Sequence, residues 1–592
     1  MAQLIAELLS NPAQSMVVTS LAIVTIYIIY QRYFHPLAQF PGPFLASVTD
    51  LWQVNQFLTF KQPYYLTALH ERYGPFVRYG PDKISVTVED AVPLLYQKGG
   101  RMFPKTEFYD AYGAAHPNVF GMRDEAKHSV RRRHMSHSFS MAYIKGMEVY
   151  LDQNIKLLKD NIATYCSSGQ AFDLTQLLHF YVIDVLGELA FSQSFGVQET
   201  RDEGRIPPVK EHSLLSAATG AWPAMTFRLK RWLPMVPLKS LRALFQGRQA
   251  CADLAAKCVE RRLQDLQEAR DDEVLAETQR KDILTNLILA RHPDTGERLT
   301  KADLETEAFG FIIAGTHTTS ATMSLLFYHF LHAPELMTQC IAEIDEKLPE
   351  LQADQPAYPV ATAESSLPFL RGCVKENFRI TPVFTMPLAR RVLDPAGISL
   401  GGRHVPGGTS VAICNHAFHH DPAVWGSDHN VFRPSRWEEK GTAERSRLLM
   451  HFGLGPRQCI GKTVATTNIY KVVSTLLKEF TFELADEQER KDVEQGLYRE
   501  RIPSMDQLAY GDTELRLQQY KVLEGVCARS FQFLCIDGTV ETTGVVTHAR
   551  CPGAAHCGEV RSVGRGGGEK AVELTTSHQV KRSRDVVRSL NL

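Results

Sequence analysis

The sequence lacks several features that would assign it to a common class of protein. Its 11 cysteines include no Cys-x-x-Cys pair and follow no short regular spacing, so we expect reduced thiols in a reducing compartment rather than a disulfide framework. The 65 basic residues balance 66 acidic ones, which argues against a nucleic-acid partner. No Gly-x-Gly-x-x-Gly fingerprint lies on a strand–helix–strand unit, so the chain is not expected to bind a dinucleotide itself.

What the chain does contain is one long apolar segment at its N-terminus. The 24 residues between Glu7 and Arg32 carry no charge, which is enough for a helix across roughly 30 Å of hydrocarbon. Glu7 precedes this run and tyrosines gather at its far end, which favours a membrane anchor over a cleaved signal peptide. Since Arg32 is the first basic residue, the positive-inside rule places the rest of the chain in the cytosol.

The remaining organisation follows from composition. We expect an anchor in residues 1–33, spanning the membrane at about 10–31, then a proline-rich hinge in 34–45 that stops the anchor helix. Residues 46–515 show no linker, charge run or repeat and read as one large body. The polar, glycine-rich residues 516–592 predict a disordered tail.

Helical patterns dominate the predicted body, with a minor β part. The stretch 301–333 predicts one long helix, because a Thr300-x-x-Asp303 capping signal precedes it and Pro334 ends it. Short strands are predicted at 76–80 and 480–484, where apolar residues alternate. The fold class is therefore mainly α.

The chemistry is concentrated around one cysteine. The pattern Phe452-x-x-Gly455-x-Arg457-x-Cys459-x-Gly461 would arise by chance in a chain of this length on the order of once in ten thousand. The apolar spacing after it is helical, so Cys459 lies just before a helix N-terminus, where backbone N–H groups favour a thiolate. Glycines here, Gly453 among them, let the backbone fold closely beneath a flat ligand. A thiolate behind such a loop suits axial ligation of haem iron.

This segment resembles the haem-binding loop of the cytochrome P450 superfamily, and other segments match that family in the same order. Glu376 and Arg379 resemble its Glu-x-x-Arg pair, and Arg436 in "FRPSRW" resembles the arginine that completes this ion network. The resemblance implies the cytochrome P450 fold behind a single transmembrane helix. It is strongest to fungal membrane-bound members of the pisatin-demethylase-like group.

Within the predicted long helix, the segment 314–319 resembles the family's oxygen-binding segment. The resemblance implies that Thr318 helps hold the water that delivers protons, since threonines can bond the i−4 carbonyl and open the turn locally. Many members carry an acid just before this threonine, whereas His317 stands here. A histidine can relay protons near neutral pH, but a histidine merely hydrogen-bonded within the bundle is an equal alternative.

The haem carboxylates require cationic or hydrogen-bonding partners. The helix "HSVRRRHMSHSFS" resembles the one that supplies such partners, with His128 in place of a tryptophan and Arg132 four residues later. Arg457 and Arg390 resemble the remaining contacts, with Arg391 as the alternative to Arg390. Phe452, Gly453 and Gly461 complete the cofactor loop around Cys459.

The resemblance implies a monooxygenase that oxidises a small lipophilic metabolite with O2, in fungal secondary metabolism. Its cofactor is haem b on Cys459, and electrons come from NADPH through a separate cytochrome P450 reductase, with cytochrome b5 as an optional donor. The expected location is the endoplasmic reticulum membrane, with the catalytic domain in the cytosol. The alternatives are a haem-thiolate isomerase or dehydratase that uses no O2 and a catalytically impaired haem-binding protein.

The resemblance also indicates which segments lie over the haem and choose the substrate. They are residues 100–121, 205–245, 309–316 and 382–388. Their apolar side chains favour a lipophilic substrate: Phe103, Tyr109, Phe120, Trp222, Phe311, Ile312, Val383, Phe384 and Met386.

Overall fold

The computed structural model describes residues 12–97, 102–271, 280–485, 491 and 520–522. The chain divides after Arg529 into two units, and all of the second unit lies outside the described ranges. The predicted tail, 516–592, therefore falls outside them except for Tyr520–Val522, which form a strand. The predicted disordered tail included these three residues, which form a strand instead.

The N-terminal apolar segment forms a helix, as predicted. α2 (Pro12–Ile29) continues through a π-helical turn at Tyr30–Phe34. The whole helix is long and apolar enough to cross a membrane, and none of the residues of α2 is buried. It ends just before Pro36. The other described helix that passes this test, α9 (Leu174–Phe191), is largely buried inside the protein, as a core helix is.

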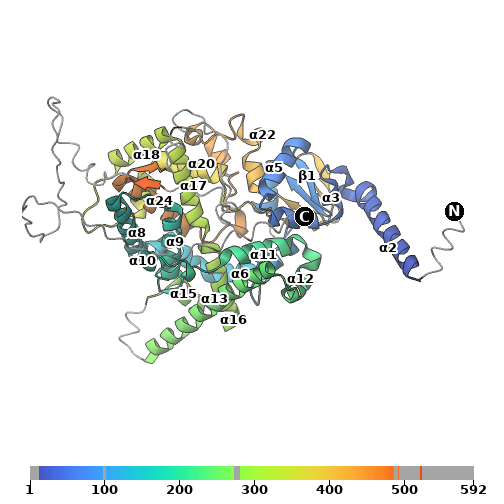
Figure 1. Cartoon of the computed structure of the whole chain (residues 1–592), viewed down its shortest axis with the longest axis horizontal. Coiled ribbons are helices and arrows are strands. Elements are labelled where there is room, and N and C mark those ends of the chain that lie inside the picture. The colour runs from blue at the N-terminus through green and yellow to red at the C-terminus, as the bar shows by residue number, and fades with distance from the viewer. Residues whose placement is uncertain (1–11, 98–101, 272–279, 486–490, 492–519, 523–592) are drawn as a thin grey trace, which may run out of the picture. The chain divides into compact units, whose positions relative to one another are not determined.

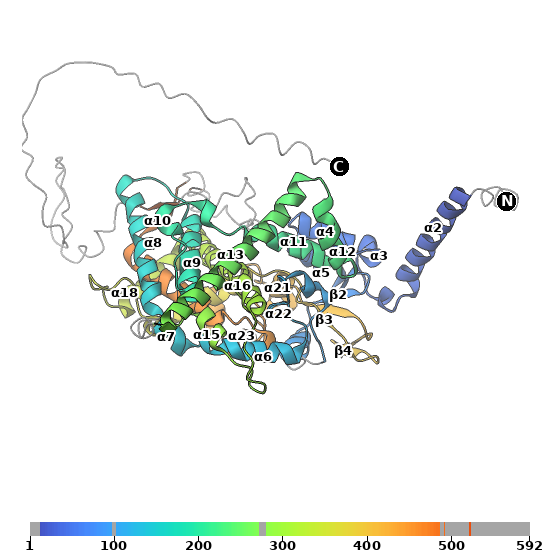
Figure 2. The same ribbon diagram turned by 90° about the horizontal axis from the view of Figure 1, so that it is seen from below.

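Helices make up most of the described chain. Helices α8, α9, α17 and α24 pack together (Figure 1) and share the largest apolar core; α8 and α9 also lie side by side in Figure 2. A second group packs α13 against α11 and α16. The bounds of the helices before the centre of the chain are α3 Phe44–Val48, α4 Leu51–Leu58, α5 Gln62–Tyr73, α6 Glu125–Ser136, α7 Met141–Gly146, α8 Glu148–Ser168, α10 Val197–Thr200, α11 Val209–Ala221, α12 Thr226–Trp232 and α13 Lys239–Asp271. The later helices are α15 Ile283–Leu289, α16 Lys301–Gly315, α17 Thr318–His332, α18 Pro334–Lys347, α19 Val360–Ser366, α20 Pro368–Ile380, α21 Asn415–His419, α22 Pro422–Trp425, α23 Thr442–Ser446 and α24 Lys462–Glu479.

The β part is small, as predicted. One four-stranded sheet has the order β1-β2-β6-β3, in which β2 and β6 are parallel and the other neighbours antiparallel. Two further pairs, β4 with β5 and β7 with β8, are antiparallel. The strands are β1 Phe76–Gly80, β2 Lys83–Val86, β3 Arg390–Arg391, β4 Ile398–Leu400, β5 Arg403–Val405, β6 Ser410–Ala412, β7 Phe482–Leu484 and β8 Tyr520–Val522.

The predicted single helix at 301–333 is wrong in one respect: it is broken. Its start is as expected, because Thr300 and Asp303 form the capping box, and α17 ends at His332, before Pro334. Between α16 and α17, however, Thr316 and His317 leave the helical ladder. The hydroxyl of Thr316 donates to the Ile312 carbonyl at 2.5 Å, and such bonds from threonine to the i−4 carbonyl bend helices.

Candidate active site

The loop around Cys459 is closed by its own backbone. The N–H of Cys459 donates to the Phe452 carbonyl at 2.7 Å, and Gly453 and Gly455 have φ of +64° and +63°, which favours glycine. A Cβ on Gly455 would lie 2.2 Å from the Tyr96 carbonyl oxygen. The predicted helix after the loop is α24, with Gly461 as its N-cap residue.

Cys459 differs from every other cysteine in the described residues. Its side chain is exposed, whereas five of the others are buried and one is half-buried. Although the side chain is exposed, protein atoms surround the Cys459 thiol, and this desolvation raises its pKa. Hydrogen bonds from the Gly461 and Lys462 backbone and the charge of Arg132 act in the opposite direction. The predicted helix N-terminus therefore does favour the thiolate, but it does not by itself lower the pKa of the thiol below its usual value.

The cysteine loop and α16 contribute to one apolar cluster. Ile460, next to the cysteine, packs against the apolar cluster that contains Ile312 of α16. Ala314 is exposed within a helix whose other face is buried, and the Thr318 hydroxyl donates to the Ala314 carbonyl at 2.9 Å. The threonine thus makes the i−4 bond that the sequence predicted.

Five basic side chains gather beside the loop. Lys105, His128, Arg132, Arg390 and Arg457 lie close enough that their positive charges act on one another. Burial, and then these neighbouring charges, lower the pKa of His128 to about 3 and that of Lys105 well below its usual value.

Among the described residues, one ion pair joins this group of five side chains to a carboxylate, that of Glu125. It pairs with Arg457 at 2.7 Å. The predicted residues His128, Arg132, Arg390 and Arg457 therefore do come together, and they leave a surplus of positive charge that needs an anionic partner.

The structure decides between two neighbouring arginines and adds a residue that the sequence reasoning missed. Arg391 pairs with Asp82 and Glu107, both at 2.6 Å, so Arg390 is the member of the basic group. Lys105 was not predicted, because no motif marks it. Its ammonium donates to the Phe120 carbonyl at 2.6 Å.

The predicted ion network is formed and fully buried. Glu376 receives a bidentate bond from Arg379, with distances of 2.7 and 3.0 Å, and the Nε of Arg436 lies 3.4 Å from it. Glu376 and Arg379 come from α20, and Arg436 comes from the 3-10 turn Pro434–Glu438. The network joins α20 to this turn, and the adjoining Phe378 ring packs 5.2 Å from Phe452 of the cysteine loop.

Part of the predicted apolar lining also comes together. Phe120 lies 5.4 Å from Tyr109 and 6.1 Å from Phe384, between ring centroids, and Phe120 and Met386 pack on one cluster. Phe103 and Ile312 sit in two further apolar clusters, and Phe384 packs against the one that contains Phe103. The segments 100–121 and 382–388 are thus neighbours, as expected.

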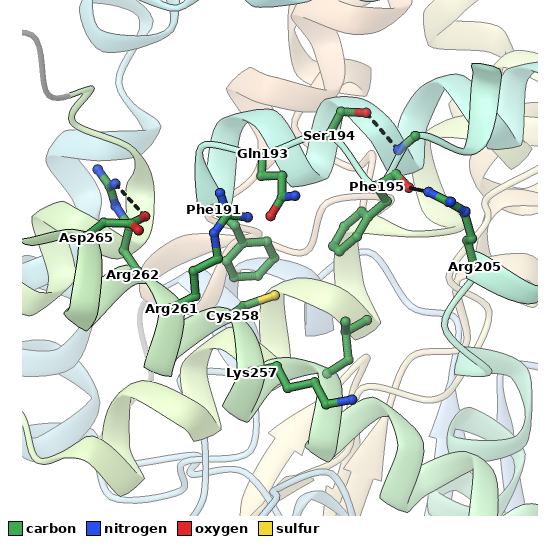
Figure 3. Close-up of a pocket in the computed structure, with 12 residues that line it drawn as sticks. Phe191, Gln193, Ser194, Phe195, Arg205, Lys257, Cys258, Arg261, Arg262 and Asp265 are labelled. Carbon is green, nitrogen blue, oxygen red and sulfur yellow. Dashed lines mark hydrogen bonds and ion pairs between the residues drawn. The ribbon is translucent and has the colours of Figure 1, made fainter. Parts of the chain in front are cut away.

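The residues present fit haem b. Such a group offers one iron for an axial ligand and two carboxylates for cations, and the structure supplies an exposed thiol beside a cationic surplus. A cavity of about 280 Å³ lies elsewhere, among Phe191, Phe195, Lys257 and Cys258 (Figure 3). Its lining includes no residue of the cysteine loop, the helix break or the basic group.

Comparisons with known proteins agree with this geometry. The family model for Cytochrome P450 matches residues 41–504. A cytochrome P450 monooxygenase, gsfF, of Penicillium aethiopicum is 32% identical over 78% of this chain and 91% of that protein. Pisatin demethylase of Fusarium vanettenii is 28% identical over 79% of this chain and 89% of its own length. Benzoate 4-monooxygenase bphA of Aspergillus niger is 29% identical over 79% and 92%.

The match to the family model extends from the end of the apolar N-terminal helix past the cysteine loop and α24. It therefore takes in every site residue that the sequence predicted. This chain belongs to the cytochrome P450 family and is an oxidoreductase of the monooxygenase type.

Proposed function

We propose that this enzyme inserts one oxygen atom of O2 into a small lipophilic metabolite of fungal secondary metabolism. One O2, two electrons and two protons convert the substrate's C–H bond into C–OH and release one water. Bound haem would supply the reductive activation of O2. The observation that carries the proposal is the exposed Cys459 thiol beside a buried group of basic side chains.

Each part of the site has one proposed task. Cys459 would bind the haem iron through its thiolate, and the backbone bond to Phe452 holds the cysteine in place. The basic side chains would bind the two carboxylates of the cofactor. Thr318 would hold a water near the substrate's reaction position. The ring of the neighbouring His317 is neutral, because burial lowers its pKa well below the usual value, and it would take part in proton delivery as a neutral hydrogen-bonding group.

The substrate class follows from the apolar residues and from the relatives. Tyr109, Phe120 and Phe384 form an aromatic wall near Arg390, whose Nη1 donates to the Tyr109 hydroxyl at 3.1 Å. Aromatic walls of this kind bind flat apolar molecules. Two relatives are named for benzoate and pisatin, so we propose an aromatic metabolite first.

The proposed setting is the endoplasmic reticulum membrane, with α2 as the single anchor and the catalytic domain in the cytosol. Arg32, at the end of the apolar helix, supports this orientation. We propose a separate NADPH–cytochrome P450 reductase as the electron donor, with cytochrome b5 as an optional second donor.

The test is turnover by the full-length protein in membranes with reductase and NADPH, offered benzoate, pisatin and a panel of other aromatic metabolites. We expect a product that carries one atom from isotopically labelled O2 and that the Cys459→Ala variant does not form. Turnover that persists without NADPH and reductase would instead support an isomerase or dehydratase. A normal carbon monoxide complex with no product from any panel member would support a haem-binding protein without catalysis.

A further inference from the structure

A neighbouring helix, α9, lies against the break between α16 and α17. Leu186 of α9 packs so closely on Gly315 that a Cβ added to this glycine would come within 2.8 Å of the leucine side chain. His179 is two helical turns earlier, on the same face of α9. The side of the break that α9 covers therefore meets one apolar and one polar side chain of this helix.

His179 contacts His317 of the break and Ser320 in the first turn of α17. Its ring is stacked on that of His317, with centroids 4.4 Å apart and planes 5° apart. Its Nδ1 lies 3.4 Å from the Ser320 hydroxyl, and this hydroxyl donates to the His317 carbonyl at 3.0 Å. The ladder of α17 begins with the same His317 carbonyl, which accepts from Ala321, so His179 contacts the residues that start α17.

Burial, and after it a neighbouring positive charge, keeps both rings neutral at neutral pH. Burial lowers the pKa of His179 to about 4 and that of His317 well below its usual value. Lys210 of α11 acts on both rings in the same direction. Two neutral rings can stack closely, whereas two protonated rings at this separation would repel each other.

We infer that His179 is a positioning residue for the oxygenation reaction, because its ring stacks on that of His317 and its Nδ1 contacts the Ser320 hydroxyl, which in turn binds the His317 carbonyl. The broken turn then stays open and Thr318 keeps its bond to the Ala314 carbonyl. The consequence for catalysis rests on the proposed function, whereas the structural role at the break does not.

If His179 only filled space beside the break, any flat ring of similar size could replace it without effect. A phenylalanine at position 179 would keep a flat ring against His317, but it would remove the nitrogen that contacts the Ser320 hydroxyl. The Nε2 of His317 is buried and has no hydrogen-bond partner among the described residues, so the break already contains one unmatched polar atom. Loss of the contact with Ser320 would weaken the first turn of α17 and favour its fraying.

The experiment compares His179→Phe with His332→Phe in the full-length protein. His332 lies on α17 too, but its ring bonds the Tyr328 carbonyl of its own helix. Amide hydrogen exchange is followed by mass spectrometry in the segment 312–322, together with product formed per NADPH consumed. For His179→Phe we expect exchange about fivefold to tenfold faster, as for the loss of one hydrogen bond, and a lower product yield. His332→Phe should change neither.

A third variant, His179→Asn, keeps a hydrogen-bond donor and should recover part of the exchange protection and of the yield. It also keeps the test decisive if the phenylalanine variant does not fold. Exchange equal to that of the unaltered protein, or faster exchange with an unchanged yield, overturns the inference. If the chain binds no haem, the proposed function fails, yet the exchange comparison still decides whether His179 holds the break.

Discussion

The buried carboxylate of Glu376 gives the sharpest prediction about stability. It accepts two bonds from Arg379, one from the Trp437 ring N–H at 3.0 Å and one from the Arg433 backbone at 3.2 Å, and Arg436 lies within 3.4 Å. Glu376→Gln removes the negative charge and replaces one acceptor oxygen with a donor. Arg379 is then left buried without a carboxylate.

Loss of one partner from a buried ion pair costs about 3–5 kcal/mol. Arg436 is less affected, because its Nη1 also donates to Asp428 at 3.0 Å. An unfolding entropy of about 2.1 cal/mol/K per residue over roughly 470 residues is about 1 kcal/mol per kelvin. The melting temperature should therefore fall by about 3–5 °C for Glu376→Gln.

The assay is thermal unfolding of the full-length protein in detergent, followed by tryptophan fluorescence. Glu346→Gln is the control, because Glu346 is exposed on α18, and a surface change of this kind stays within about 0.5 kcal/mol. The double variant Glu376→Leu with Arg379→Met should lose less than the sum of its two single changes, since no charge is stranded. Equal melting temperatures for Glu376→Gln and Glu346→Gln would refute the reasoning.

Three further predictions concern other parts of the site. Burial raises the pKa of Glu307 from 4.5 to about 7, so the stability that this carboxyl group contributes is lost as the pH rises through that range. The unfolding free energy of Glu307→Gln, relative to that of the unaltered protein, should therefore be higher at pH 8 than at pH 4 by about 3 kcal/mol. A difference between the two proteins that does not change with pH would contradict this. Gly455→Ala should destabilise the protein by about 1–3 kcal/mol more than Gly402→Ala. Both glycines have positive φ, but only at position 455 would the added Cβ collide with a backbone atom. Equal melting temperatures for the two variants would contradict this. Lys105→Met should increase the rate at which haem is lost to a scavenging protein about tenfold, as measured by absorbance. Lys127→Met, a change at an exposed residue, should leave this rate unchanged. Equal rates for the two variants would show that Lys105 does not help to bind the haem carboxylates.

The parts predictable from sequence are those whose determinants are local. The cysteine loop, its glycines and the start of α24 lie within a few residues of one another, and the Thr300 capping box is also a local signal. The Glu376 and Arg379 pair shares one face of α20 because it is spaced three residues apart. The spacing of residues within a few positions of one another was therefore enough to predict these elements.

The parts that escaped prediction depend on contacts between distant segments. The helix break was predicted only as a local opening, because the side chain that meets it, His179, comes from α9, more than a hundred residues earlier. Lys105 joins the basic group through a loop that carries no motif. Arg391 looked equivalent to Arg390 until Asp82 and Glu107 were seen to hold it.

The division of the chain into anchor, hinge, catalytic domain and tail stays a prediction. So do the individual roles of the site residues in binding the cofactor and delivering protons. Their spatial grouping is consistent with those roles, since residues from α6, the 3-10 turn Gly455–Arg457 and strand β3 meet at one place.

The most direct test of the central claim is the absorption spectrum of the reduced protein under carbon monoxide. The unaltered full-length chain should give the band of thiolate-ligated haem, Cys459→Ala should lose it, and Cys258→Ala should keep it, because Cys258 lines the separate cavity. A purified chain without haem, or a band unchanged in Cys459→Ala, would contradict the account.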